Sequence, residues 1–382
     1  MDRPRPPASA PLTKADLSTP ALIVDLDLLE ANIAALAAHA RGAGCHLRPH
    51  AKTHKCPAIA RMQVAAGARG IAVATVAEAE AMVAAGLPGV LLTSPIADAG
   101  KVGRMVDLAR AGGDVLLAVG HAHQAQLMAE AAEAAGVGVD VLIDLDMGDR
   151  RFGIAPGAPA LDLARLIGRS PSLRIRGVQA YYGYAAHVAG FDARRATTRA
   201  ALARAVDTFE ALKRAGVPVE FLSCGSTGTY NIDSDLSVPV ELQSGSYVFM
   251  DNEYRSVGAP GSETYADFHR ALTVLATVVS AHHADRVTVD AGVKSFASDT
   301  PFRPEPKGRP GLAYEFHGDE FGRLTADPGT DLPRLGDRIE FYPPHCDPTV
   351  NLYDRIHATR GDRVEAVWPI LARKEFLPLP GS

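Results

Sequence analysis

The stretch RPHAKTHK, residues 48–55, places two histidines and two lysines close together. Neighbouring positive charge lowers the pKa of an amine, and an amine with a lowered pKa is a good nucleophile. Lys52 comes just after CHLRPH (45–50), a run that predicts a strand, so it stands near a strand end. The chemistry that this setting suggests is a Schiff base between Lys52 and an aldehyde, and the alternative is a solvated loop lysine.

Short apolar runs alternate with Ala-rich helical patterns along residues 21–225. This alternation predicts βαβ units around a buried parallel sheet, and about eight units favour a (β/α)8 TIM barrel over a doubly wound sheet. In such barrels the reacting groups lie at the carboxyl ends of the strands, which is where Lys52 is expected. The runs predicted as strands are ALIVDL (21–26), CHLRPH (45–50), GIAVAT (70–75), VLLTS (90–94), DVLLAV (114–119), VDVLIDL (139–145), IRGVQAYY (175–182) and VEFLSCG (219–225).

After about residue 255 the pattern changes, because β-branched runs separated by turn-rich loops replace the long helical patterns. This change predicts a β domain. We therefore expect a barrel over residues 21–255 and a β domain formed by residues 1–20 and 256–382. The β-branched runs are ALTVLATVVSA (271–281), DRVTVDAG (285–292), DRIEFYPPH (337–345) and DRVEAVWPIL (362–371).

Two loops late in the predicted barrel are rich in glycine and hydroxyl residues, SCGSTGTYN (223–231) and QSGSY (243–247). Such loops offer backbone N–H groups and hydroxyls to an anion, and barrels commonly hold a phosphate after their last strands. A lysine at the barrel end together with a phosphate site indicates pyridoxal phosphate. The residues expected to bind the cofactor here are Ser226, Thr227, Gly228, Gly245, Ser246 and Tyr247.

Three further side chains are expected in the cofactor pocket. Arg151, in DMGDRRFGI (146–154), follows a predicted strand and can donate to the cofactor's phenolate oxygen or to a substrate carboxylate, with a surface arginine as the alternative. Gln179 and Tyr181 are two residues apart on one predicted strand, so they share a face. Both are expected to line the pocket, although Tyr181 also suits a place in the core.

His345 and Asp347, in PPHCDPTVNLYD (343–354), are two residues apart after a predicted strand, so both side chains can point to the same side. Imidazole with a hard carboxylate suits a divalent cation that keeps positions open for water or substrate, and it favours Mn²⁺ or Mg²⁺. The alternative is a hydrogen-bonded His/Asp pair within a turn. The residues alone leave both interpretations open.

The bulk composition limits the other classes of function. The net charge of −5 favours binding to neither nucleic acid nor an anionic membrane. The four cysteines are scattered without CxxC pairing, which argues against a disulfide framework and fits a reducing cytoplasm. No apolar run approaches the ~20 residues that span a bilayer, and the Pro-rich, polar N-terminus lacks the apolar segment of a signal peptide.

Taken together, these motifs resemble the metal-activated D-threonine aldolase and D-serine dehydratase family, fold-type III pyridoxal phosphate enzymes related to alanine racemase. RPHAKTHK is similar to the family's cofactor-lysine motif, and DMGDRRFG is similar to its D-x-G-x-x-R-x-G stretch. VQAYYGYAAH, SCGSTGTY, ELQSGSYVFMD and DAGVKSFASD resemble further family blocks, so the resemblance covers nearly the whole chain. It implies that Lys52, and not Lys55, forms the Schiff base, and that His345 and Asp347 bind the metal.

The metal motif distinguishes the activities within this family. Its dehydratases typically carry His-x-Cys and its aldolases His-x-Asp, so this chain resembles the aldolases. The resemblance implies a homodimer that cleaves D-3-hydroxy amino acids between Cα and Cβ, for example D-threonine to glycine and acetaldehyde. We expect His187, in YYGYAAH, to take the proton of the substrate's β-hydroxyl, and the alternative for His187 is a surface loop histidine.

Other functions stay open at this point. A 3-hydroxy-D-aspartate aldolase shares the His-x-Asp pattern, and a D-serine or 3-hydroxy-D-aspartate dehydratase uses the same residue types. A non-catalytic pyridoxal phosphate carrier resembles the bare barrel, but it needs neither a β domain nor a metal motif. A racemase needs a second acid/base, usually a tyrosine of the β domain, for which Tyr265, Tyr314 and Tyr342 are the candidates.

Overall fold

The computed structural model describes residues 12–375, and these residues form two compact units. The barrel unit comprises residues 33–247, 254–267 and 371–375, and the sheet unit comprises residues 12–32, 248–253 and 268–370. The first eleven residues, which include much of the predicted N-terminal part of the β domain, lie outside the described residues. Among the described residues, no helix is long and apolar enough to span a bilayer.

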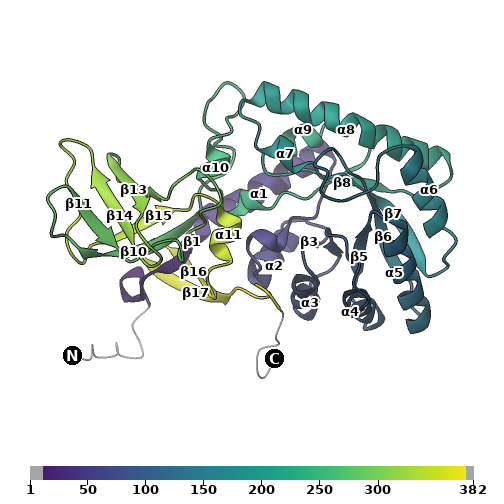
Figure 1. Ribbon diagram of the computed structural model, residues 1–382, viewed down its shortest axis with the longest axis horizontal. Coiled ribbons are helices and arrows are strands. Elements are labelled where there is room, and N and C mark those ends of the chain that lie inside the picture. Colours follow the sequence, from purple (N-terminus) through teal and green to yellow (C-terminus); the bar gives the residue numbers. More distant parts are fainter. Residues whose placement is uncertain (1–11, 376–382) are drawn as a thin grey trace. The chain divides into compact units, whose positions relative to one another are not determined.

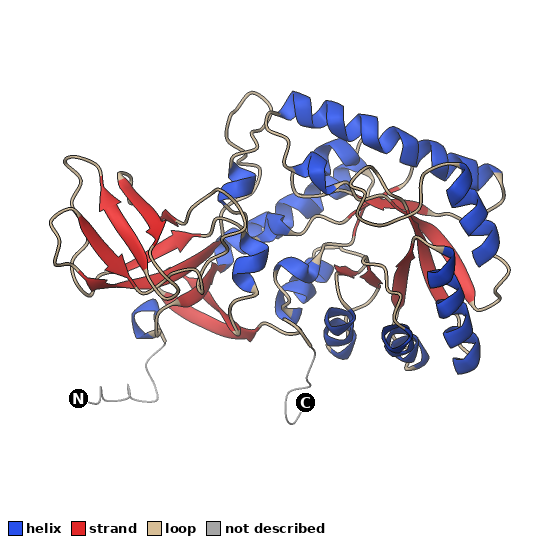
Figure 2. Cartoon of the chain, viewed as in Figure 1, coloured by secondary structure: helices blue, strands red, loops and turns tan. Residues whose placement is uncertain are grey.

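The barrel unit is built on eight parallel strands, which confirms the predicted (β/α)8 class. Their order is β2-β9-β8-β7-β6-β5-β4-β3, and a parallel bridge between His50 and Ala72 joins the two ends of this order. All carboxyl ends therefore meet at one rim of the barrel (Figure 2). The strands are β2 (His46–Leu47), β3 (Ile71–Val73), β4 (Val90–Leu92), β5 (Val115–Val119), β6 (Val139–Asp144), β7 (Leu173–Gln179), β8 (Phe221–Cys224) and β9 (Val240–Leu242).

Helices follow most of the barrel strands, and several begin at a capping residue that the sequence supplies (Figure 1). Thr75 and Asp98 accept hydrogen bonds from the backbone N–H of Glu78 and Lys101, which satisfies the first turns of two helices. The helices are α2 (Pro57–Ala65), α3 (Val76–Ala84), α4 (Ala99–Arg110), α5 (Ala122–Ala135), α6 (Ala158–Ile167), α7 (Gly183–Ala186), α8 (Phe191–Arg214) and α9 (Tyr230–Asp233), while α1 (Leu26–Ala43) and α10 (Asn252–Arg255) include residues of both units.

The central strands of the barrel are buried on both faces. Every residue of β5, β6 and β8 is buried, because one face of each strand points into the barrel and the other lies under helices. Leu91, Leu116, Leu142 and Phe221, from four different strands, form one apolar cluster. This continuous burial explains why these segments appear in the sequence as unbroken apolar runs.

The sheet unit is a mostly antiparallel sheet in which buried and partly exposed residues alternate along strands such as β11 and β15. Its main path is β13-β14-β11-β10-β1-β16-β17, and β15 pairs with both β10 and β12. The strands are β1 (Ala21–Asp25), β10 (Leu272–Ser280), β11 (Arg286–Val289), β12 (Glu305–Pro306), β13 (Leu312–Phe316), β14 (Gly322–Ala326), β15 (Arg338–Tyr342), β16 (Arg355–Arg360) and β17 (Arg363–Pro369).

The structure differs from the sequence-based expectation in one strand of each unit. Residues 21–25 were expected to begin the barrel, but β1 lies in the sheet unit, where Ala21 pairs with Leu275 and Ile23 with His357. The eighth barrel strand is instead β9, a run of three residues that shows no clear strand pattern. A short apolar run suits either sheet, so its partners, far away in the sequence, decide where it belongs.

Candidate active site

A pocket of about 130 Å³ opens at the carboxyl ends of the barrel strands. Its lining combines the predicted lysine with residues that follow β3, β4, β7 and β9. The structure therefore brings four of the predicted site residues together in the barrel unit. The lining residues are His50, Lys52, Ala74, Thr93, Ser94, Arg151, Phe152, Gln179, Tyr181 and Gln243.

Lys52 is held by a short 3-10 turn, η2 (Ala51–Thr53), just after β2. His50 caps this turn, because its Nδ1 accepts from the backbone N–H of Lys52 over 3.3 Å while its Nε2 lies 3.1 Å from Thr93 Oγ1. Gly245 allows the turn to pack against the next loop, since a Cβ there would lie 2.7 Å from Thr53 Oγ1. Lys52 is thus placed by contacts on both sides of its turn.

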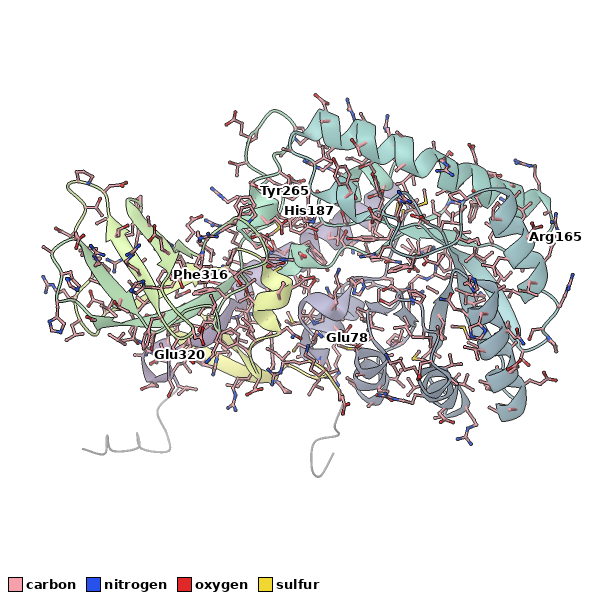
Figure 3. All side chains as sticks on the ribbon, in the orientation of Figure 1. Glu78, Arg165, His187, Tyr265, Phe316 and Glu320 are labelled. Carbon is pink, nitrogen blue, oxygen red and sulfur yellow. The ribbon has the colours of Figure 1, made fainter. Side chains whose placement is uncertain are left out.

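Lys55, the second lysine of the motif, has a different environment. Its Nζ lies 2.9 Å from Oε1 of Glu78, and the side chains of Lys55 and Glu78 are 12% and 1% exposed. Glu78, marked in Figure 3, also accepts from the backbone N–H of Ala74. Lys52 Nζ, by contrast, lies 6.0 Å from the ring centroid of Tyr181, and both residues line the pocket. The structure thus places Lys52 in the pocket and gives Lys55 a buried ion pair.

Arg151 lies against two aromatic rings. Its guanidinium carbon is 4.4 Å from the ring centroid of Phe152 and 5.6 Å from that of Tyr181. Stacking of this kind fixes the plane of the guanidinium and leaves its N–H edge available to an acceptor. Arg151 and Lys52 thus both lie near the ring of Tyr181, and all three residues line the pocket.

Gln179 is the centre of a buried polar network that the sequence analysis did not find. Its Nε2 donates to Asp144 Oδ1 over 2.8 Å and to the Thr93 carbonyl over 2.9 Å. Gln243 Nε2 donates to Gln179 Oε1 over 3.2 Å and to Ser223 Oγ over 2.8 Å. These bonds fix the orientation of two amides in the pocket wall. The only advance signal was their position at strand ends.

The network continues away from the pocket to a buried ion pair. Ser223 Oγ donates to Glu241 Oε1 over 2.8 Å, and Arg48 Nε donates to the same oxygen over 2.9 Å. All three residues are buried. Arg48 also donates to the Gly89 carbonyl, so the chain of polar contacts ends on the backbone. A buried hydrogen-bond network of this kind rigidifies the barrel next to the site.

Asp144, which accepts a hydrogen bond from Gln179, is a buried carboxyl group of this network. Burial raises the pKa of Asp144 to about 7, while the hydrogen bond from Gln179 and the charge of Arg151 oppose the rise. Its Oδ2 has no hydrogen-bond partner among residues 12–375. An orphaned buried acceptor is costly unless it is protonated or receives a further donor. Asp144 was not among the predicted site residues.

The predicted phosphate loops follow β8 and β9, which are neighbours in the barrel. β9 also pairs with β2, and His50 N–H donates to the Ser244 carbonyl over 3.2 Å, so these loops adjoin the turn that carries Lys52. Thr227 Oγ1 and Ser244 Oγ are buried and have no hydrogen-bond partner within the described part of the chain. Two orphaned hydroxyls at glycine-rich loops fit an anion, and Ser244 adds a candidate to the predicted set.

Three of the remaining residues that were predicted to bind the cofactor make contacts within the protein that stabilise their loops. Ser226 Oγ lies 3.0 Å from Thr229 Oγ1 inside its loop. Ser246 begins a 3-10 turn, η3 (Ser246–Val248), and Tyr247 is buried with its hydroxyl accepting from Gln63 Nε2 over 3.1 Å. Tyr247 therefore anchors the loop to α2, which contains Gln63.

His187 ends the short helix α7 and lies on the surface of the barrel unit. Figure 3 labels His187. Its backbone N–H donates to the Tyr184 carbonyl over 3.3 Å, and its ring centroid lies 5.0 Å from that of Tyr254. α7 follows β7, so His187 comes from the same barrel rim as Gln179 and Tyr181. Its ring is accessible, as a proton acceptor requires.

In the sheet unit, His345 and Asp347 stand at the start of α11 (Cys346–Val350) among further carboxylates. His345 Nδ1 lies 2.8 Å from Asp299 Oδ2 and 3.8 Å from Glu253 Oε2. Asp251 Oδ2 accepts from the backbone N–H of Cys346 over 2.8 Å. Within residues 12–375, no group of three or more His, Cys, Asp or Glu side chains is arranged to hold a metal ion.

The carboxylates around His345 shift the pKa values of His345 and Glu253. Burial by itself would lower the pKa of His345, but the negative charges of Asp347 and Asp251 and the hydrogen bond with Asp299 raise it above the ordinary value. Burial raises the pKa of Glu253, His345 opposes this rise, and Asp299 and Asp347 add to it. Negative charge crowded around Glu253 and His345 is an environment that a divalent cation would neutralise.

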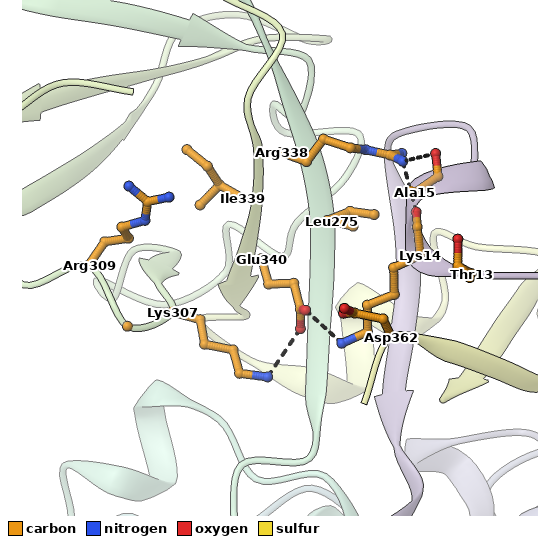
Figure 4. Close-up of a pocket in the computed structure, with 11 residues that line it drawn as sticks. Thr13, Lys14, Ala15, Leu275, Lys307, Arg309, Arg338, Ile339, Glu340 and Asp362 are labelled. Carbon is orange, nitrogen blue, oxygen red and sulfur yellow. Dashed lines mark hydrogen bonds and ion pairs between the residues drawn. The ribbon is translucent and has the colours of Figure 1, made fainter. Parts of the chain in front are cut away.

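A larger pocket, of about 680 Å³, lies in the sheet unit (Figure 4). Its floor carries Glu340, whose carboxylate binds Lys14 Nζ over 2.7 Å and Lys307 Nζ over 3.2 Å. Arg338, on the same strand, donates to backbone carbonyls, including those of Lys14 and Ala15. The charges drawn together here stabilise one another, because both lysines that line the pocket bind the carboxylate of Glu340. Size alone therefore does not identify the site.

Comparison with known proteins agrees with this architecture. Residues 24–252 match the family model of the alanine racemase N-terminal domain, and residues 271–359 match that of a putative serine dehydratase domain. The chain therefore belongs to the alanine racemase N-terminal domain family, and its barrel of parallel strands fits that class.

Within that class it belongs to the family of D-threonine aldolase. It is 37% identical to D-threonine aldolase of Arthrobacter sp over 96% of both chains. It is 32% identical to 3-hydroxy-D-aspartate aldolase of Paracoccus denitrificans (strain Pd 1222), over 96% of this chain and 95% of that one. The crystal structure of D-threonine aldolase from Filomicrobium marinum is 38% identical, with a TM-score of 0.91, and the match covers 96% of this chain and 99% of that one.

Proposed function

We propose that this protein is a pyridoxal phosphate- and divalent-metal-dependent aldolase that cleaves D-3-hydroxy amino acids, with D-threonine giving glycine and acetaldehyde. The observation that carries the proposal is Lys52, which lines a pocket at the barrel rim while the neighbouring Lys55 is bound to Glu78. The relatives named D-threonine aldolase and 3-hydroxy-D-aspartate aldolase support the same reaction class.

The pocket residues fit pyridoxal phosphate. Lys52 would bond to its aldehyde, Arg151 would donate to its phenolate oxygen, and Gln179 and Tyr181 would line its ring. The orphaned hydroxyls of Thr227 and Ser244 suit the phosphate. When bound, the cofactor supplies an electrophile for the substrate amine and a sink for the electron pair released at Cα. The other residues proposed for the phosphate are Ser226, Gly228, Gly245, Ser246 and Tyr247.

His345 and Asp347 are the proposed ligands of the metal, for which their donor set favours Mn²⁺ or Mg²⁺. The cation supplies Lewis acidity, which lowers the pKa of a bound hydroxyl. Asp299 acts on His345, because its hydrogen bond to Nδ1 holds the ring and leaves Nε2 as the coordinating atom.

The proton transfers of the reaction involve side chains of the protein. His187 takes the proton of the substrate's β-hydroxyl, so that the oxygen forms a carbonyl as the Cα–Cβ bond breaks and the aldehyde leaves. The electron pair of that bond stays with the Cα fragment. The ammonium of Lys52, or water, then returns a proton to Cα, which completes the glycine product, and the lysine amine can displace that product.

A dehydratase is the second candidate, because residues 271–359 match the putative serine dehydratase domain. The His-x-Asp spacing favours the aldolase, since the resembling dehydratases carry His-x-Cys. The racemase is less well supported. The hydroxyls of Tyr265 and Tyr314 are buried and donate to the carbonyls of Thr227 and Ala291, and the ring of Tyr342 lies 3.6 Å from the Arg270 guanidinium carbon. A non-catalytic carrier leaves the cluster around His345 unexplained.

The proposal also includes a cytoplasmic homodimer. All four cysteines lie within the described residues and none of them forms a disulfide there, which suits a reducing compartment. The dimer follows from the family resemblance alone, and light scattering coupled to gel filtration tests it.

Product analysis tests the reaction. Purified protein with pyridoxal phosphate, Mn²⁺ and D-threonine should form glycine and acetaldehyde, and EDTA should abolish the activity. The same assay with 3-hydroxy-D-aspartate would show which substrate is preferred. Formation of 2-oxobutanoate and ammonia would instead establish the dehydratase. Conversion of D-threonine to L-allo-threonine that withstands EDTA would establish the racemase, because a racemase inverts Cα and leaves Cβ unchanged.

A further inference from the structure

Arg194 is a completely buried arginine near the start of helix α8, in the barrel unit. Its guanidinium donates to four backbone carbonyls. Nε donates to Gly228 over 2.7 Å, and Nη1 donates to Val188 over 3.0 Å and to Val257 over 2.6 Å. Nη2 donates to Gly258 over 2.7 Å. One side chain thus joins three loops.

Two of these loops carry proposed functional groups. Val188 follows His187 directly, and Gly228 belongs to the loop proposed for the cofactor's phosphate. The same loops also touch each other, because a Cβ on Gly228 would lie 2.3 Å from the Ala186 carbonyl oxygen. The proposed phosphate loop and the turn before His187 therefore pack against each other, and the hydrogen bonds of Arg194 also join them.

Tyr265 strengthens the same assembly. Its hydroxyl donates to the Thr227 carbonyl over 2.6 Å, and its ring centroid lies 5.7 Å from the guanidinium carbon of Arg194 (Figure 3 marks Tyr265 and His187). The carbonyls of Thr227 and Gly228 thus both point to donors of the protein. A peptide group whose carbonyl accepts such a bond is polarised so that its N–H becomes a better donor to an anion.

The charge of Arg194 has no carboxylate in contact with it among residues 12–375, because its hydrogen bonds all run to carbonyls and no ion pair includes it. Burial lowers the pKa of Arg194, and the more distant Tyr265 and Asp267 oppose this. Burial of an unneutralised cation is costly. A phosphate dianion at the adjacent loop would supply the missing negative charge.

The geometry points to Arg194 as a positioning residue that couples an anion in the 226–228 loop to the position of His187. This inference rests on the proposed function, because it takes the loop as the phosphate site and His187 as the base. An anion bound by the 226–228 loop restricts the motion of that loop. The restriction extends to residues 186–188 through the hydrogen bonds of Arg194 and through the contact between Gly228 and Ala186. Cofactor binding then orders the base before the substrate arrives.

Hydrogen exchange tests the coupling directly. Exchange of the amides in residues 183–190 is measured with and without pyridoxal phosphate in wild type, Arg194→Lys and Arg194→Gln, together with the dissociation constant of the cofactor. Arg195→Lys is the matched control, because Arg195 lies on the same helix and binds the exposed Asp192 at 3.0 Å. Inorganic phosphate alone serves as a second probe that needs no Schiff base.

In wild type and in Arg195→Lys, we expect either probe to slow exchange in residues 183–190. In Arg194→Lys and Arg194→Gln the cofactor should bind roughly 10-fold more weakly, since one or more charge-assisted hydrogen bonds are lost. At saturating cofactor these variants should still lack the slowed exchange and show a lower kcat with little change in KM. Equal protection in wild type and Arg194→Lys would overturn the coupling, even if both variants were less stable.

Gly228→Ala provides a second variant in case an Arg194 variant does not fold. It keeps Arg194 but separates the two loops, so it should also uncouple cofactor binding from protection of residues 183–190. Unchanged protection in this variant would count against the coupling. A wild type that binds phosphate and protects residues 183–190, but does not bind pyridoxal phosphate, would overturn the proposed function and leave the coupling intact.

Discussion

Asp299 Oδ2 lies 2.8 Å from His345 Nδ1, so a carboxylate 46 residues away in the sequence sets the orientation of the proposed metal-binding imidazole. A histidine that ligates a metal commonly bonds to a carboxylate through its other ring nitrogen, and this partner fixes the tautomer. Asp299 lies in DAGVKSFASD, a block that resembles the family without any assigned role. The structure assigns it the role of holding His345.

Asp299→Ala is therefore expected to weaken Mn²⁺ binding by about 10- to 100-fold, because His345 loses the partner that orients it. Isothermal titration of the purified protein with Mn²⁺ measures this effect without any turnover. The matched control is Asp285→Ala, since Asp285 is exposed and pairs with its neighbour Arg286, away from His345 in the sequence. Equal affinity in wild type and Asp299→Ala would show that Asp299 does not position the ligand.

Replacing the two lysines of the motif should separate chemistry from stability. Lys52→Ala should abolish the absorbance of the cofactor aldimine, because the amine that reacts with the aldehyde is gone. Lys55→Ala should keep this absorbance but lower the free energy of unfolding by on the order of 3 kcal/mol, because Glu78 becomes a buried, unpaired carboxylate. Denaturant titration measures the second effect. Loss of the aldimine signal in Lys55→Ala alone would reverse the assignment.

Asp144 should contribute to the stability of the cofactor-free protein by an amount that falls as the pH rises from about 4 to about 7. Burial raises the pKa of Asp144 from 3.8 to about 7, so the folded state holds this proton more tightly than the unfolded state does. The stabilisation is fully present below pH 3.8 and is lost as the pH passes through about 7.

Asp144→Asn should remove this pH-dependent contribution, which is at most about 4 kcal/mol. Urea titrations of wild type and variant at several pH values give the comparison. Asp233→Asn is a useful second variant, because burial also raises the pKa of Asp233 to about 7. A difference in stability between wild type and Asp144→Asn that stays constant from pH 4 to 7 would mean that Asp144 keeps an ordinary pKa.

Gly245→Ala should disturb the turn of Lys52. The added Cβ would lie 2.7 Å from Thr53 Oγ1 and 3.0 Å from the His50 carbonyl oxygen, so the turn must shift. We expect the cofactor to bind roughly 10-fold or more weakly, because small displacements of a reacting group have large effects. Absorbance titration with pyridoxal phosphate measures the change.

Gly103→Ala is the control for this substitution, because its Cβ would meet nothing within 4 Å in helix α4. It should stabilise the protein by about 0.5–1 kcal/mol and leave cofactor binding unchanged. If Gly245→Ala also bound the cofactor as wild type does, the close packing of the two loops would have no role in placing Lys52.

Local sequence patterns were enough to predict much of this protein. Apolar runs alternating with helical patterns predict the barrel because buried parallel strands and their covering helices leave a signal within about ten residues. Lys52, Arg151, Gln179 and Tyr181 could be placed near one pocket because the carboxyl ends of barrel strands share a rim. The His-x-Asp pair was equally visible, since its spacing is local.

Only the tertiary structure decided the relationships between distant residues. It placed β1 in the sheet unit and made β9 the eighth barrel strand, because strand partners are chosen across the whole chain. It also paired Lys55 with Glu78, His345 with Asp299 and Arg194 with the Gly228 carbonyl. Each of these contacts depends on backbone paths that bring remote segments within a few ångströms, and no local pattern of residue types encodes such a distance.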